Sequence, residues 1–249
     1  MKPTQVKELF INIVSRYLSD FGFEIEEKSR ASRYGQYVIY QKQHDDSVLY
    51  EFQMTFTSYL AFQPHLAVYY RQILDIVKEI DKTAYNNGMG YTFSSDVFEY
   101  FDTQNADGYR NVGASLYLQI AEPFEEMNVN RQANEFCTVK LTPLISSIIE
   151  RTDTLEKADK LINEQFPLKV RNRKWIERLF TGKRKMGWVT FILCPYIPTQ
   201  MSMSLLLAKL SNRQNLQALL AEYAKYLSSQ EIKNNSSMEL LHNIIKYLK

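Results

Sequence analysis

The chain has 249 residues, of which 45% are hydrophobic and 23% charged, a composition that excludes a disordered chain and suffices for one large core or two smaller ones. Its net charge of +2 conceals a division, because residues 1–166 carry 16 Lys and Arg against 24 Asp and Glu, whereas residues 167–249 carry 14 against 4. Such a basic C-terminal part either meets an acidic partner or is attracted to the acidic part of its own chain, and the sequence leaves both open.

A helix is predicted over about residues 4–21, where apolar side chains recur at spacings of three and four. Gly22 follows at the place of a left-handed C-cap, and the pattern of the next residues changes to the period of a strand. The apolar positions of the helix are Val6, Leu9, Phe10, Ile13, Val14, Tyr17, Leu18 and Phe21.

Two further strands are predicted, at Tyr37–Tyr40 and Val48–Phe56, with a turn over residues 44–47 between them. Alternation in the second strand places two different sets of side chains on its two faces, which is typical of a half-buried antiparallel sheet. One face would hold Val48, Tyr50, Phe52, Met54 and Phe56, and the other Leu49, Glu51, Gln53 and Thr55.

The rest of the chain is predicted to be mostly helical. Helical spacing recurs over about residues 66–84 and again over 141–149, with strand-like pieces at 90–93 and 114–120 between them. Asp153 and Glu156 have the spacing of a capping box that opens another helix. Three last helices are expected over about residues 200–210, 212–227 and 236–248.

These elements predict an α+β chain in two parts. An acidic part, residues 1–166, would hold a mainly antiparallel sheet with flanking helices, and a basic, mainly helical part, residues 167–249, would pack on it.

The main candidate binding segment is a basic stretch over residues 169–188, in which Glu177 is the only acid. Its cations could hold phosphates while a tryptophan stacks on a base, they could meet an acidic protein, or they could form an ordinary solvated face whose tryptophan packs inward. The candidate residues are Lys169, Arg171, Arg173, Lys174, Trp175, Arg178, Lys183, Arg184, Lys185 and Trp188.

Motifs for catalysis, cofactors or metals are incomplete. Gly182-Lys183 lacks both the earlier glycine and the following Ser or Thr of a phosphate-binding loop. The three histidines have no second His or Cys at ligand spacing, and Cys137 and Cys194 are better explained as buried thiols than as nucleophiles. No cofactor, metal ion or catalytic residue is therefore predicted.

The same two cysteines also indicate in which cellular compartment the chain is expected. They are too few and too far apart for the disulfide framework of a small secreted domain. The first 14 residues are amphipathic, unlike a signal peptide, and the longest apolar stretch, at 188–197, is about half the length of a membrane-spanning helix. We expect a cytoplasmic chain that does not enter the membrane.

Tyrosine is unusually frequent, with 17 residues in the chain, ten of them between Tyr34 and Tyr100. Tyr34, Tyr37 and Tyr40 crowd one strand region, and tyrosine-rich sheet faces are favoured at protein interfaces. The alternative is a set of half-buried rings with their hydroxyls in water.

Residues 4–82 show a family resemblance, carried by the opening helix, the pair Gly22-Phe23 and the aromatic–glutamine steps Tyr40-Gln41 and Phe52-Gln53. This arrangement resembles small uncharacterised bacterial α+β domains, some of them associated with toxin-immunity loci. The resemblance implies a cytosolic binding role.

Three hypotheses for function follow. The first is a non-enzymatic module that binds another protein, as an immunity-like protein would. The second is a nucleic-acid-binding protein that uses residues 169–188. The third is an enzyme whose site is assembled from separated residues.

Overall fold

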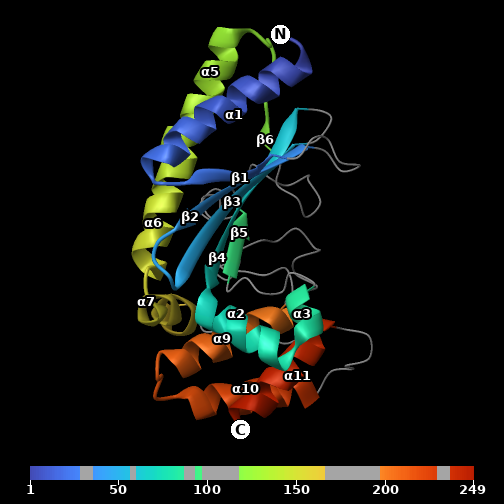
Figure 1. The fold of residues 1–249 in the computed structure, drawn as a ribbon, viewed down its shortest axis with the longest axis vertical. Helices are drawn as coiled ribbons and strands as arrows, with labels where there is room; N and C mark the ends of the chain where they lie inside the picture. The colour runs from blue at the N-terminus through green and yellow to red at the C-terminus, as the bar shows by residue number, and fades with distance from the viewer. Residues whose placement is uncertain (29–35, 57–59, 87–92, 97–117, 166–196, 229–235) are drawn as a thin grey trace, which may run out of the picture. The chain divides into compact units, whose positions relative to one another are not determined.

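The computed structural model describes residues 1–28, 36–56, 60–86, 93–96, 118–165, 197–228 and 236–249 (Figure 1). The strands are β1 (Glu24–Lys28), β2 (Gln36–Gln43), β3 (Val48–Phe56), β4 (Ala61–Tyr70), β5 (Phe93–Asp96) and β6 (Leu118–Gln119). The α-helices are α1 (Pro3–Asp20), α2 (Arg71–Ile80), α3 (Lys82–Asn86), α5 (Glu126–Glu135), α6 (Thr142–Thr152), α7 (Leu155–Asp159), α9 (Ile197–Leu210), α10 (Leu216–Ser228) and α11 (Ser236–Leu248). Two π-helical segments, η1 (Phe136–Leu141) and η2 (Lys160–Gln165), continue α5 and α7.

The predicted α+β class is confirmed. The chain forms two compact units, the first built from residues 1–44, 49–66 and 96–150 and the second from residues 45–48, 67–95 and 151–249. The expected boundary near residue 166 lies outside the described residues, so the division at that point stays a prediction.

Helix α1 confirms the first predicted helix and its end. Proline occupies the first helical position, where its missing N–H removes no helical hydrogen bond. At the other end Gly22 has a φ of +78°, and the Phe23 N–H donates to the Leu18 carbonyl at 3.0 Å. The Gly22 N–H donates to the Ser19 carbonyl at 2.9 Å, which completes a Schellman motif and turns the chain into β1.

The sheet has the strand order β1-β2-β3-β4-β5, and β6 pairs with β4. β1 with β2, β2 with β3, and β4 with β6 are antiparallel. The turn between β2 and β3 lies over residues 44–47 as predicted, and the Asp45 carboxylate closes it by accepting from the Ser47 N–H at 2.7 Å and the Val48 N–H at 3.0 Å.

One face of the sheet packs under helices of the first unit. The five alternate residues predicted for one face of β3 are all buried, and the four between them are half-buried. The Phe62 ring of β4 contacts Phe10 of α1 with centroids 4.8 Å apart and Phe136 of η1 with centroids 5.3 Å apart. Helices α1 and α5 run side by side (Figure 1), so α1 and the segment after α5 together cover this face.

The helix predicted over residues 66–84 is wrong in its first five residues, because β4 extends to Tyr70 and α2 begins at Arg71. Residues 66, 67, 68 and 70 are all buried. A strand buried on both faces has no clean alternation, and its apolar run matched helical spacing by coincidence. The predicted helix also missed the break at Asp81, which separates α2 from α3.

The three last predicted helices are confirmed as α9, α10 and α11, and α9 contacts both others. Residues 201–208 of α9 are all buried, which makes it the central helix of the second unit. The predicted cap at Asp153 is displaced by one residue, because Thr154 caps α7 by accepting from the Lys157 N–H at 3.3 Å. Within the described ranges, none of the helices combines the length and apolar character that crossing a membrane requires.

Candidate functional site

All ten candidate residues of the basic stretch 169–188 lie outside the described residues. The same holds for Cys194 and for the Gly182-Lys183 pair. The binding role of this stretch therefore stays a prediction.

The tyrosines of the sheet are mainly core residues. Tyr40 is only 1% exposed, so the interpretation of a tyrosine-rich exposed face is wrong for this ring, and Tyr50 is fully buried on the face of β3 that it was predicted to share with Phe52. The Tyr40 hydroxyl lies 2.9 Å from the Ser15 hydroxyl of α1, a bond that satisfies its polar end without water. Tyr37 is half-buried, and Tyr34 lies outside the described residues.

The remaining candidates for chemistry lie apart from one another. Cys137 of η1 is fully buried, and burial raises the pKa of its thiol to about 12. His44 packs edge-on against the Tyr50 ring with centroids 6.2 Å apart, and burial lowers the pKa of His65 on β4. In the part of the chain that the structure describes, no three His, Cys, Asp or Glu side chains come together as metal ligands.

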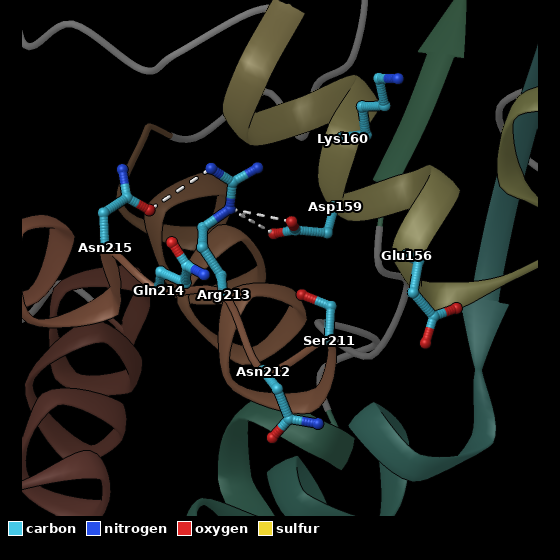
Figure 2. A pocket seen from close by; sticks show the side chains of 8 residues that line it. All are labelled: Glu156, Asp159, Lys160, Ser211, Asn212, Arg213, Gln214 and Asn215. Atoms are coloured by element: carbon cyan, nitrogen blue, oxygen red, sulfur yellow. Dashed lines mark hydrogen bonds and ion pairs between the residues drawn. The ribbon is translucent and has the colours of Figure 1, made fainter.

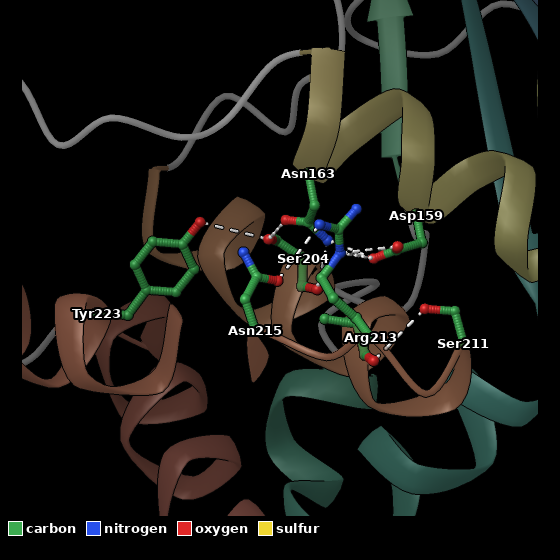
Figure 3. Close-up of polar contacts among 8 residues, drawn as sticks. Asp159, Asn163, Ser204, Ser211, Arg213, Asn215 and Tyr223 are labelled. Atoms are coloured by element: carbon green, nitrogen blue, oxygen red, sulfur yellow. Dashed lines mark hydrogen bonds and ion pairs between the residues drawn. The ribbon is translucent and has the colours of Figure 1, made fainter. Parts of the chain in front are cut away.

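A polar network that was not predicted lies inside the second unit (Figure 3). Its centre is the Asp159 carboxylate at the end of α7, which accepts from Arg213 Nε at 2.8 and 3.1 Å and from the Asn163 amide at 2.7 Å. The Asp159 and Arg213 side chains are only 9% and 10% exposed, so this is a buried ion pair.

The network continues into α9 and α10. The Ser204 hydroxyl of α9 donates to Asn163 Oδ1, and the Asn163 amide donates back to the Ser204 carbonyl at 3.1 Å. The Tyr223 hydroxyl of α10 lies 3.3 Å from the Ser204 hydroxyl, and burial raises the pKa of Tyr223 to about 12. Tyr223 thus stays protonated at neutral pH, and the network links η2, α9 and α10 through neutral hydrogen bonds and one ion pair.

The turn between α9 and α10 positions Arg213. Asn212 adopts the left-handed conformation with φ +55°, and the Arg213 N–H donates to the Ala208 carbonyl at 2.9 Å in a second Schellman motif. This sharp turn directs the Arg213 side chain between Asp159 and Asn215, whose Oδ1 accepts from Arg213 Nη1 at 3.3 Å (Figure 2).

An open pocket of about 510 Å³ adjoins this turn. It is lined by Glu156, Asp159, Lys160, Ser211, Asn212, Arg213, Gln214 and Asn215 (Figure 2). The two carboxylates balance the two cations, so the lining has no net charge to select an ion. We interpret the network as a structural support for the helical unit, with a polar, amide-rich hollow beside it.

The second face of the sheet, opposite the face that the helices cover, is a mixed polar and apolar surface. Its residues on β2 and β3 pair across the strands as Tyr37 with Thr55, Ile39 with Gln53, and Gln41 with Glu51. All six are half-buried, and the Gln41 amide donates to the Glu51 carboxylate at 3.0 Å. The face therefore mixes aromatic, aliphatic, amide and carboxylate groups, which is typical of protein-binding surfaces.

Strand β1 forms one end of the sheet and is well exposed. Glu24, Ile25 and Glu26 are all exposed, although Ile25 pairs directly with Tyr40, which is buried. The register shifts between Ile25 and Glu27, a bulge of the type common in edge strands.

Comparison of the chain with protein-family models, with curated proteins and with solved structures found no match.

We predict that breaking the Asp159–Arg213 pair destabilises the second unit. Replacement of Asp159 by Asn should lower the free energy of unfolding by about 3–5 kcal/mol, because Arg213 would keep its buried charge without the carboxylate. The measurement is urea unfolding followed by circular dichroism.

The matched control is Asp153→Asn. This substitution breaks the more exposed pair between Asp153 and Lys157, which are 26% and 49% exposed, and should change stability by at most about 1 kcal/mol. Equal losses in the two variants would contradict the structural role of the buried pair. In a double-mutant cycle, D159N and R213M should be non-additive.

A second prediction concerns alkaline pH and Cys137. The folded chain holds the thiol proton to about pH 12, whereas an unperturbed thiol loses it near 9.0. Unfolding therefore releases a proton above pH 9, and stability falls as the pH rises from there. Urea midpoints measured from pH 8 to 10.5 should fall less steeply for Cys137→Ala than for the unaltered chain. Parallel pH profiles would show that Cys137 does not titrate on unfolding.

Proposed function

We propose that this chain is a non-enzymatic protein-interaction module of the cytoplasm that binds its partner through the second face and the β1 edge of its sheet. The observation that carries the proposal is the strict division of β3, whose alternate residues are buried while Leu49, Glu51, Gln53 and Thr55 remain half-buried on the other face.

The composition of the second face supports a protein as ligand. It presents Tyr37 and Ile39 for apolar contact beside amide and hydroxyl groups that can exchange hydrogen bonds with a partner. The Gln53 amide donates to the Thr55 hydroxyl at 3.1 Å, which orders the neighbouring polar groups before any partner arrives. Binding to an ordered surface loses less side-chain entropy.

The resemblance of residues 4–82 to bacterial α+β domains, some associated with toxin-immunity loci, supports the same kind of role. An immunity-like protein holds a second protein in a stable complex. Its contact surface would be the second face of the hairpin of β2 and β3, opposite the face that α1 covers.

Site-specific cross-linking tests this proposal. A photo-activatable residue at position 53, on the second face, should capture one defined protein in cells that produce the chain. The same residue at position 217, an exposed glutamine of α10, serves as the matched control. Capture of the same protein from both positions, or of none from position 53, would contradict binding through this face.

Nucleic-acid binding through residues 169–188 is a second candidate. The supporting observation is the run of eight Lys and Arg with a single acid between positions 169 and 185. Neutralised phosphates release counterions, so affinity would fall steeply with salt concentration.

We expect the triple variant R171A/K174A/R178A to flatten the slope of log affinity against log salt by about 2–3. The control variant K209A/K225A/K246A removes the same charge from three exposed positions of the C-terminal helices and should leave the slope unchanged. Fluorescence anisotropy with a labelled oligonucleotide measures both. Absence of binding at low salt would reject this candidate.

A further inference from the structure

We propose that the outer edge of β1 accepts a short, extended, basic segment of the partner protein as an additional strand. This inference rests on the proposed function and deepens it, because it names the contact strand and the chemistry of the segment that pairs with it.

The topology leaves this edge available. β1 stands at the end of the strand order and pairs with β2 on one side, and no strand in the described ranges lies on its other side. Ile25 is 50% exposed while its cross-strand partner Tyr40 is 1% exposed. The Ser15 hydroxyl of α1 reaches the Tyr40 hydroxyl of β2, whereas the Ile25 side chain paired with Tyr40 stays half exposed on β1.

An edge strand carries backbone N–H and C=O groups that can pair with another extended chain. Main-chain hydrogen bonds to such an edge provide affinity without sequence preference, and the side chains beside them provide specificity. On β1 those side chains are exposed Glu24 and Glu26, with exposed Ile25 between them. A segment that carries Lys or Arg beside apolar residues complements these side chains in charge and in character.

The same charges disfavour a second copy of β1 as the partner. Antiparallel pairing of two β1 strands centred on Ile25 would place Glu24 of each strand directly opposite Glu26 of the other, which is destabilising. The bulge between Ile25 and Glu27 bends the strand and limits any added strand to a short segment. The β1 edge thus disfavours a second β1 strand and favours a basic segment.

Peptide binding to the full chain tests the inference. The probe is a fluorescein-labelled, capped decapeptide of alternating Lys and Val, and its counterpart alternates Glu and Val. The Lys/Val peptide should bind saturably at about 150 mM salt, where screening limits unspecific attraction to about 8 Å. The Glu/Val peptide should not bind.

Charge reversal identifies the site. The variant E24K/E26K should bind the Lys/Val peptide at least about tenfold more weakly and should gain affinity for the Glu/Val peptide. The control E8K/E122K makes the same change of charge at two other exposed glutamates of the first unit and should bind the Lys/Val peptide within about twofold of the unaltered chain. Equal losses in the two variants would overturn the inference, because they would show attraction to net charge alone.

Hydrogen exchange tests strand addition to β1 independently of the peptide affinities. Backbone amides within Glu24–Lys28 should exchange more slowly when the Lys/Val peptide is bound. Binding without this protection would place the peptide elsewhere and overturn the inference. If no peptide binds although position 53 still cross-links a partner, strand addition at β1 is wrong and binding through the second face stands. If the peptide binds but position 53 captures nothing, the second face is wrong and the β1 edge stands.

Discussion

Burial of one face of the sheet beneath α1 and η1 is the constraint on which the first unit depends. Phe62 lies between Phe10 and Phe136, so one ring joins a strand, the opening helix and the π-helical segment. Aromatic rings remove large apolar areas from water and favour tilted or edge-on contacts, which fix the helices over the sheet. The alternation along β3 then decides that the remaining side chains stay half-exposed on the opposite face.

The second unit is organised by a different interaction. Its central helix α9 is buried all along residues 201–208, and a helix buried in this way has many equivalent ways to pack against its neighbours. The ion pair between Asp159 and Arg213 and the hydrogen bonds of Ser204 select one of them, because any other packing would leave buried polar groups without partners. Specific arrangement, more than added stability, is the role that buried polar groups of this kind support.

Both proposed contact surfaces follow from the first constraint. Among the described residues, helices cover one face of the sheet, and the proposed contact surfaces are its other face and its outermost strand, which carries Glu24 and Glu26 beside exposed Ile25. Acidic side chains along an edge prevent indiscriminate pairing between copies and at the same time select a basic segment. The acidic composition of residues 1–166 extends this preference beyond the immediate contact, since long-range fields steer oppositely charged partners.

The sequence by itself determined the elements whose signals are local. The helix that ends before Gly22, the alternation of β3, the turn at residues 44–47 and the last three helices depend on spacing and on single capping residues, and all were predicted. Tertiary structure alone decided that residues 66–70 form a strand, because burial on both faces removed the alternation that marks a strand. It also decided that Asp159 meets Arg213, 54 residues away, and that β1 is the outermost strand. Residues that pair across a long stretch of chain leave no periodic pattern in the sequence, because many different paths of the intervening chain can bring the same two residues together.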